Sequence, residues 1–176
     1  MTYRKLQAVM YGTATWLIVA TLLMSDLAVA GEPVKRTFVV QGLHCPPCTN
    51  TVEAALKRTK GIESAKVEWN SKNAWITFDE SVISAQQIAQ AIATTPHMMG
   101  RGMHYQASLA LQVPELKDDV TAEKVKAALS EVTGVAAVYP YPKQQSVTVR
   151  FQAAGKLTTD DLIAALKKAG FEATPF

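Results

Sequence analysis

Both cysteines of this 176-residue chain lie in one short stretch, Gly42–Thr49, which reads Gly-Leu-His-Cys-Pro-Pro-Cys-Thr. The residues before it, 37–40, are apolar and β-branched, which predicts a strand. After it, residues at i, i+3, i+4 and i+7 between Val52 and Thr59 have the spacing of one helix face. The two thiols are therefore expected at a strand-to-helix turn, with the second thiol near the first turn of the helix.

This position favours the thiolate form of both side chains. The first amides of a helix have no partner inside the helix, and the helix dipole adds partial positive charge there. Thiolate is the form that binds metal ions or attacks disulfides. Gly42 permits a sharp turn, and Pro46 and Pro47 suit the start of a helix. The turn is predicted to hold two anionic sulfurs close together and partly exposed.

The N-terminus has the composition of an export signal. Arg4 and Lys5 are followed by an apolar run over about residues 14–24 and then by Ala-Val-Ala at 28–30. This order predicts a signal peptide over residues 1–30 and a periplasmic or otherwise exported protein. The alternative is an uncleaved membrane anchor, but the run is short for the roughly 20 residues that span a bilayer. We expect no stable membrane insertion after signal cleavage.

Composition excludes several classes of function. A net charge of +3 without a dense Lys/Arg block gives no support for a nucleic-acid partner. Two cysteines are too few for a disulfide framework. The chain contains no nucleophile–His–acid constellation, Gly-rich phosphate loop or dinucleotide fingerprint, so we do not expect an enzyme.

The chain after residue 30 contains an internal repeat with an offset of about 73 residues. Val52–Leu56 aligns with Val125–Leu129, and Gly61-Ile62 aligns with Gly134-Val135. Each copy has the order strand, helix, strand, strand, helix, strand. This order predicts an α+β fold of two ferredoxin-like βαββαβ units in tandem, with antiparallel sheets and helices on one face.

The first unit is assigned to residues 31–107 and the second, which lacks cysteine, to residues 108–176. Residues 103–113 must supply the last strand of the first unit and the first strand of the second, so we expect one long strand that changes sheets near Ser108. Trp75 is expected on the sheet face away from the helices.

The remaining predicted elements are strands at 35–41, 62–69, 73–78 and 171–176, helices at 47–60 and 84–94, and helices around Val125–Val132 and Leu162–Ala169. The last helix is expected to be capped by Thr159 or Asp160.

Gly42-Leu43-His44-Cys45-Pro46-Pro47-Cys48, in this strand–loop–helix setting, resembles the heavy-metal-associated domain, a family that includes the periplasmic mercury-binding protein and copper chaperones. The resemblance implies that Cys45 and Cys48 bind a soft ion, Cu(I) or Hg(II), and pass it on by ligand exchange. The implied partner is a metal-transporting membrane protein or another metal-binding protein. Leu43 stands where the family usually has Met, and the Pro-Pro pair between the cysteines stiffens the loop.

The second unit has no thiols at the equivalent positions. Asp118 and Thr121 align with Cys45 and Cys48. We therefore expect no soft-metal site there and a structural role for that unit.

A second cluster, residues 96–104, follows the second predicted helix. Chain direction through the βαββαβ unit returns this loop to the end that carries the cysteines. Its possible additional ligands are thioethers and an imidazole, which are good copper ligands and favour copper over mercury. The alternative is that the methionines fill the end of the core and His104 begins a strand. The candidate additional ligands are His97, Met98, Met99 and Met103.

Two other functions remain open at this point. A Cys-Pro-Pro-Cys pair at a helix N-terminus is also typical of thiol–disulfide redox proteins. The cysteines could instead form an inert disulfide in an interaction module.

Overall fold

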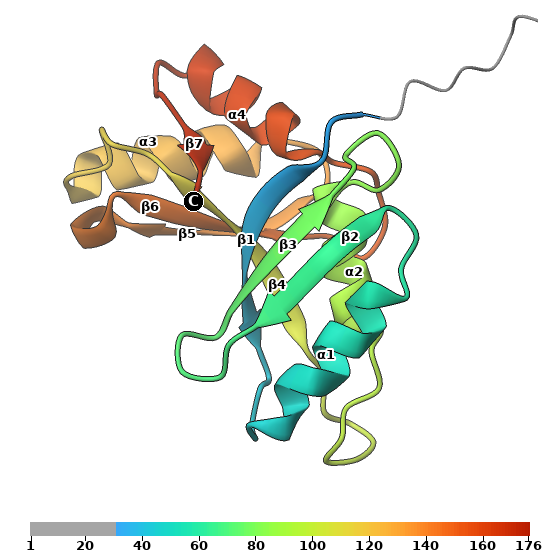
Figure 1. Ribbon diagram of the computed structural model, residues 1–176. Coiled ribbons are helices and arrows are strands. Elements are labelled where there is room, and N and C mark those ends of the chain that lie inside the picture. The colour runs from blue at the N-terminus through green and yellow to red at the C-terminus, as the bar shows by residue number, and fades with distance from the viewer. Residues whose placement is uncertain (1–30) are drawn as a thin grey trace, which may run out of the picture.

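The computed structural model describes residues 31–176, and the predicted signal peptide lies outside them. No helix in that part of the chain combines the length and apolar character needed to cross a bilayer. Figure 1 shows the elements in two groups that meet at one strand. The strands are β1 (Val34–Gln41), β2 (Ile62–Val67), β3 (Asn73–Phe78), β4 (Gln106–Gln112), β5 (Val135–Tyr141), β6 (Ser146–Phe151) and β7 (Thr174–Pro175), and the helices are α1 (Pro47–Lys57), α2 (Ala85–Ala93), α3 (Asp119–Ser130) and α4 (Thr159–Lys168).

All strands belong to one seven-stranded antiparallel sheet in the order β2-β3-β1-β4-β6-β5, with β7 pairing β4 off this path. The order β2-β3-β1-β4 is the ferredoxin-like order for the first unit. The order β5-β6-β4-β7 repeats it for the second. The predicted fold of two ferredoxin-like units is confirmed, and β4 serves both of them.

Strand β4 makes this dual role possible by pairing along both edges. On one edge, Gln106–Leu109 pairs with β1 and Leu111–Gln112 pairs with β7. On the other edge, Ser108–Gln112 pairs with β6. The predicted boundary between residues 107 and 108 thus lies inside a strand whose hydrogen bonds belong to both units.

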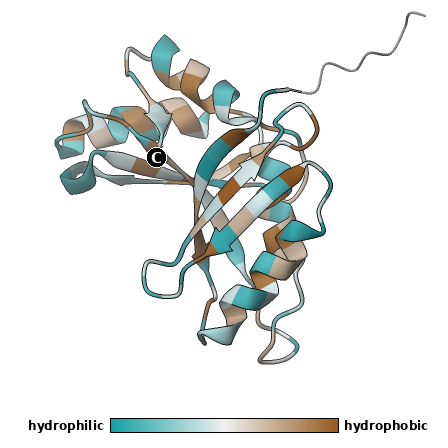
Figure 2. Cartoon of the chain, in the orientation of Figure 1, coloured by the Kyte–Doolittle hydropathy of each residue, from teal (hydrophilic) through white to brown (hydrophobic). Residues whose placement is uncertain are grey.

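The four helices cover the sheet face that carries the apolar residues. Strand residues alternate between the two faces, as the banding in Figure 2 shows. In β4, Leu109 lies opposite Phe38 of β1 on one side and Val149 of β6 on the other, and all three side chains are buried. One continuous hydrophobic core therefore runs from the first unit into the second. Trp75 lies between the buried Ala74 and Ile76 and so faces the opposite side of the sheet.

A buried glutamine also joins the two units. Gln86, in the first turn of α2, is 1% exposed. Its side-chain amide donates to the carbonyls of Gln152 and Ala154 at 3.0 and 2.9 Å, and its side-chain oxygen accepts from the Leu157 amide at 2.9 Å. Because each polar atom of this amide group has a partner in the β6–α4 connection, burial of the side chain is compensated.

Glu80 and Thr37 of the first unit also contact the second unit. Glu80 accepts a hydrogen bond of 2.6 Å from the Thr159 amide at the start of α4, where a carboxylate is also favoured by the helix dipole. The same carboxylate lies 3.4 Å from the Arg36 guanidinium. The Thr37 hydroxyl donates to the Phe176 carbonyl at 2.6 Å. These contacts join the two units through side chains in addition to the shared sheet.

Two local predictions were inaccurate. Thr158, rather than Thr159 or Asp160, caps α4, because its hydroxyl and the Asp161 side chain form a reciprocal capping box with the backbone. The closing strand is only two residues long, since β1 already occupies the rest of that edge of β4.

Replacing Gln86 by Ala should lower the free energy of unfolding by about 2–4 kcal/mol, because two carbonyls and one amide would lose their buried partner. Urea unfolding followed by circular dichroism measures this change. Gln90→Ala is the matched control, since Gln90 is an exposed residue of the same helix and should change the free energy by no more than about 0.5 kcal/mol. Equal unfolding midpoints for the two variants would contradict the proposed role of Gln86.

Candidate metal centre

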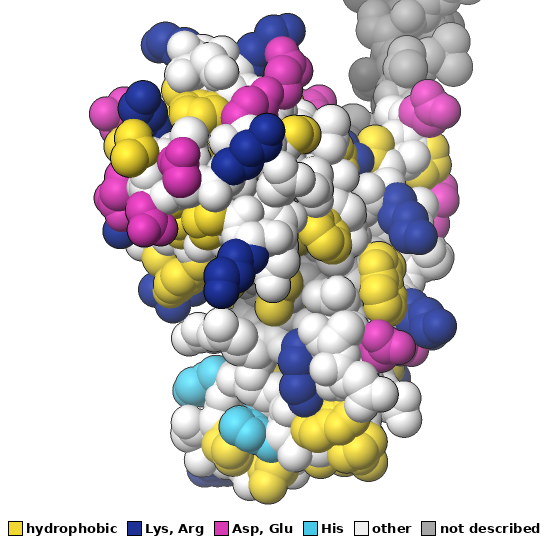
Figure 3. Space-filling model, turned by 90° about the vertical axis from the view of Figure 1, so that its left-hand side faces the viewer, with side chains coloured by type: hydrophobic (Ala, Val, Ile, Leu, Met, Phe, Trp, Pro, Cys, Tyr) yellow, Lys and Arg dark blue, Asp and Glu magenta, His cyan; other side chains and the backbone are white. Residues whose placement is uncertain are grey.

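Three loops meet at one end of the first unit. The β1–α1 loop follows Gln41, and Gln41 pairs with Gln106, which directly follows the segment of residues 94–105. The β2–β3 hairpin reaches the same end because the Val40 amide donates to the Lys72 carbonyl at 2.8 Å. In Figure 1 this end is the lower one, and Figure 3 shows two histidines and a group of hydrophobic side chains there. The cysteine loop and the second cluster therefore lie at the same end of the unit, as chain direction predicted.

Cys45 and Cys48 lie side by side at this corner. They are joined by a disulfide, with their Cα atoms 5.3 Å apart. Cys45 is partly buried, whereas Cys48 is fully buried. The prediction that both sulfurs are partly exposed is therefore wrong for Cys48. The reason is that Cys48 continues the buried stripe of α1 formed by Val52 and Leu56, at i, i+4 and i+8.

The start of α1 differs from that of the other helices. Its N-cap is Pro46, whose side chain makes no capping hydrogen bond, whereas α2, α3 and α4 each begin with a capping box. The Cys48 and Thr49 amides form tight-turn bonds to the carbonyls of Cys45 and Pro46, at 3.0 and 3.2 Å. The positive end of the α1 dipole lies beside the sulfurs, where it favours a thiolate.

Gly42 lets the 94–105 segment pack directly on the cysteine loop. Its φ of +87° is in the left-handed region, and a Cβ at this position would collide with the His104 carbonyl. The absence of a side chain thus brings the two loops into backbone contact.

His97 fastens the 94–105 segment to the cysteine loop. One ring nitrogen, Nε2, lies 2.8 Å from the Gly42 carbonyl, and the other, Nδ1, accepts from the Met99 amide at 3.2 Å. Since Nδ1 accepts, the proton lies on Nε2, which donates to Gly42. The ring also packs on buried Tyr105, with a centroid separation of 4.5 Å, and lies 5.6 Å from the His44 ring. For His97 to bind an ion, one of its two hydrogen bonds must break.

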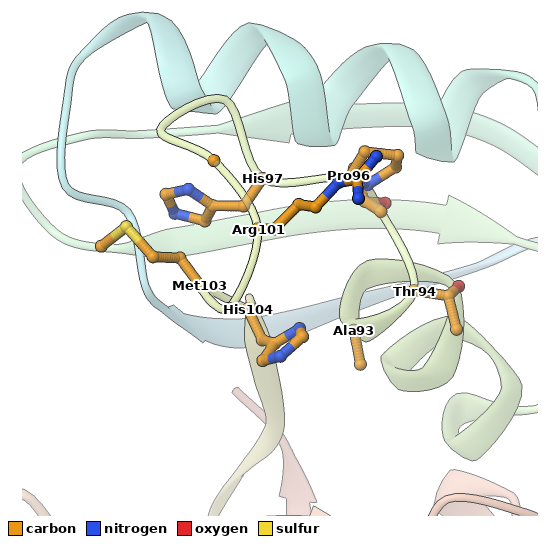
Figure 4. Close-up of a pocket in the computed structure, with 10 residues that line it drawn as sticks. Ala93, Thr94, Pro96, His97, Arg101, Met103 and His104 are labelled. Atoms are coloured by element: carbon orange, nitrogen blue, oxygen red, sulfur yellow. The ribbon is translucent and has the colours of Figure 1, made fainter.

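Three methionines lie on the same 94–105 segment as His97. Met98 and Met99 are 55% and 58% exposed, and Met103 is partly buried. Figure 4 shows Met103 and the His97 ring on the same side of the segment, toward the β1–α1 loop, while the His104 ring points away from them. An open pocket of about 640 Å³ lies along this segment. Three thioethers are thus available near the corner, and none of them is enclosed by the core.

A lysine at this corner was missed in the sequence analysis. Lys72 Nζ donates to the Leu43 carbonyl at 3.1 Å and lies 3.0 Å from the centroid of the Trp69 ring. The internal repeat could have identified it, because the repeat aligns the charged Lys72 with the neutral Gln145. Within residues 31–176, no group of three or more His, Cys, Asp or Glu side chains is arranged to hold a metal ion.

The second unit uses its equivalent loop as a helix cap. The Asp118 carboxylate accepts from the Thr121 amide at 2.8 Å and from its hydroxyl at 2.9 Å, completing a capping box at α3. Hydrogen bonds from the Thr121 amide and hydroxyl hold the pKa of Asp118 below its ordinary value of 3.8. The positions that align with the two cysteines therefore stabilise a helix in this unit.

Comparisons with known proteins agree with this architecture. The sequence profile of the heavy-metal-associated domain matches residues 37–97 and 110–172, one match in each unit. A copper chaperone, CopZ, from Enterococcus hirae is 36% identical over 59 residues, which cover 34% of this chain and 86% of that protein. The periplasmic component of the mercuric transport system of Shigella flexneri is 33% identical over 57 residues, 32% of this chain and 63% of that protein.

Among solved structures, the N-terminal soluble domains of Bacillus subtilis CopA share 20% identity with this chain. The alignment covers 83% of this chain and 95% of that structure, with a TM-score of 0.40.

The Asp118 cap predicts a pH dependence of stability. Because its pKa is lowered in the folded state, its contribution is present above pH 3.8 and is lost as the pH falls through the lowered pKa. Asp118→Asn keeps a capping oxygen but does not titrate. The stability of the parent relative to this variant should therefore decrease on acidification from pH 5 to pH 2, as measured by thermal unfolding at each pH. A difference that stays constant over this range would contradict the prediction.

Proposed function

This chain belongs to the heavy-metal-associated domain family, and from that membership we propose that it binds a soft metal ion through Cys45 and Cys48. The observation that carries the proposal is the placement of the two sulfurs within bonding distance of each other at a strand-to-helix corner. After reduction, the same backbone presents two adjacent thiolates. Soft thiolate ligands select Cu(I), Hg(II) and similar ions over hard cations.

Copper is the preferred ion. The relatives include copper chaperones and mercuric transport proteins, so family membership alone favours neither metal. The thioethers of Met98, Met99 and Met103 lie on the segment that His97 fastens to the cysteine loop. Thioethers are ligands for Cu(I), and a third ligand from this segment would complete or shield the two-sulfur site.

The protein acts as an exported metallochaperone or scavenger rather than an enzyme. Cys45 is the more accessible sulfur and faces the exchange partner. The partner is a metal-transporting membrane protein or a second metal-binding protein, which takes the ion by thiolate exchange. Export to the periplasm or outside the cell depends on the signal predicted at residues 1–30.

Cys45→Ser and Cys48→Ser should each reduce Cu(I) affinity at least about 100-fold, because serine supplies no soft ligand. The measurement is competition between the reduced protein and a colorimetric Cu(I) chelator under anaerobic conditions. The parent is expected to bind one equivalent. Ser71→Ala, on the neighbouring hairpin, is the control and should bind like the parent.

A disulfide-reduction assay on the same parent sample separates the rival functions. Metal binding without turnover supports the carrier. Turnover without metal binding supports a thiol–disulfide redox protein, and neither activity supports an inert disulfide.

Replacing Met98, Met99 and Met103 together by Leu should lower Cu(I) affinity about three- to 30-fold while leaving Hg(II) stoichiometry unchanged. Leucine keeps the apolar volume but removes the sulfur, so a purely structural role of the methionines predicts no loss. The same chelator competition measures the effect, and X-ray absorption at the copper edge reports the number of sulfur ligands. Unchanged affinity and sulfur count would restrict the site to the two cysteines.

A further inference from the structure

We propose that Lys72 supplies a fixed positive charge to the cysteine loop and so favours the anionic dithiolate that holds the ion. The inference rests on the proposed function, since it assigns a charge-supplying residue to the same site. Lys72 is on the β2–β3 hairpin, far in sequence from both cysteines, and nothing in the cysteine motif indicates it.

The ammonium group is held in place from two sides. Its Nζ donates to the carbonyl of Leu43, two residues before Cys45, at 3.1 Å. It also lies 3.0 Å from the centroid of the Trp69 ring, a cation–π contact that orients a lysine without neutralising it. The side chain is partly buried. The charge is therefore localised at the loop and is not free to move through solvent.

The second unit provides an internal control for this lysine. Gln145 occupies the equivalent position, and both residues have left-handed backbones, with φ of 59° and 48°. The carbonyl of each accepts from the first strand of its unit, Lys72 from Val40 and Gln145 from Val113. The Gln145 side chain also donates to a carbonyl of the loop after that strand, that of Pro114, at 2.8 Å.

A neutral amide thus makes a comparable contact with the neighbouring loop in the unit that lacks thiols. Pro142 there aligns with Trp69, so no aromatic ring occupies the position that supports the lysine in the first unit. At this pair of hairpin positions, the charge and its aromatic support occur only in the unit that carries the cysteines. Backbone geometry alone does not require a cation at this position.

Lys72 is not part of a structural ion pair. Among residues 31–176, no carboxylate oxygen lies within 4.0 Å of its Nζ. The acidic residue of its own hairpin, Glu68, accepts instead from the Ser71 hydroxyl at 2.7 Å. The positive charge is therefore available to the adjacent loop.

The charge balance of binding makes this cation favourable for copper. When a neutral dithiol binds Cu(I), two protons leave and two S–Cu bonds form, so the site gains one negative charge. The corresponding Hg(II) complex is neutral. A nearby cation therefore favours the thiolates and the anionic Cu(I) complex, whereas it makes no net contribution to a neutral one.

The test compares Lys72→Gln, Lys72→Arg and Gln145→Lys with the parent, all as full-length mature protein in the reduced state. Lys72→Gln copies the residue that the second unit already uses, so the fold is expected to survive, and circular dichroism checks this. At pH 6 and low salt, its alkylation by neutral iodoacetamide should slow about two- to tenfold, and its Cu(I) affinity should fall by a similar factor. Lys72→Arg keeps the charge and should retain parental values. Gln145→Lys should change neither quantity.

Salt separates a charge effect from a change in packing. In 1 M salt the Debye length is about 3 Å, so the difference between the parent and Lys72→Gln should shrink. The inference is overturned if Lys72→Gln matches the parent at low salt, if Lys72→Arg loses as much as Lys72→Gln, or if the difference does not depend on salt. A parent that binds no Cu(I) would refute the proposed function alone, because the alkylation rates still decide the role of Lys72.

Discussion

The pairing of β4 along both of its edges determines most of what this molecule can do. Its pairing with β1 places the 94–105 segment beside the cysteine loop, because Gln41 and Gln106 are register partners. Its pairing with β6 and β7 builds the second unit on the same strand. The residues that position the candidate metal centre and those that attach the second unit thus belong to one hydrogen-bonded framework. Gln86, whose amide is fully satisfied across the junction, fixes the helix layer to that framework.

The repeat separates what the fold requires from what the site requires. Both units have a hairpin residue in the left-handed region whose carbonyl accepts from the first strand, and both have a buried leucine, Leu43 or Leu116, in the loop that follows. These features are structural, because they occur with and without thiols. The cysteines, by contrast, are replaced by the Asp118–Thr121 capping box. Among the four α-helices, the start that lacks a side-chain cap is therefore that of α1, which carries Cys48.

Patterns of short range were sufficient to predict the units, most element positions and the corner that holds the two cysteines. The spacing of apolar residues located α1, and chain direction placed the 94–105 segment at the correct end. Burial of Cys48 was missed because the motif was analysed as a loop, although Cys48, Val52 and Leu56 form one helical stripe. The contacts of His97 and Lys72 could not be predicted, since they join side chains to carbonyls 55 and 29 residues away. No local pattern encodes such distances.

Contacts outside the sulfur pair hold the cysteine loop in position. His97 donates to the Gly42 carbonyl, Lys72 to the Leu43 carbonyl, and the Cys48 amide to the Cys45 carbonyl. Two acceptors of this short loop are thus held by two distant segments of the chain and a third by a bond within the loop, and none of these bonds involves a sulfur atom. Reduction of the disulfide removes a covalent link without removing these contacts. The loop backbone is therefore preorganised for two sulfur ligands, which lowers the ordering cost of binding an ion. The same constraint explains why the stiff Pro46–Pro47 pair is compatible with a metal site, because the backbone does not have to rearrange to bring the sulfurs together.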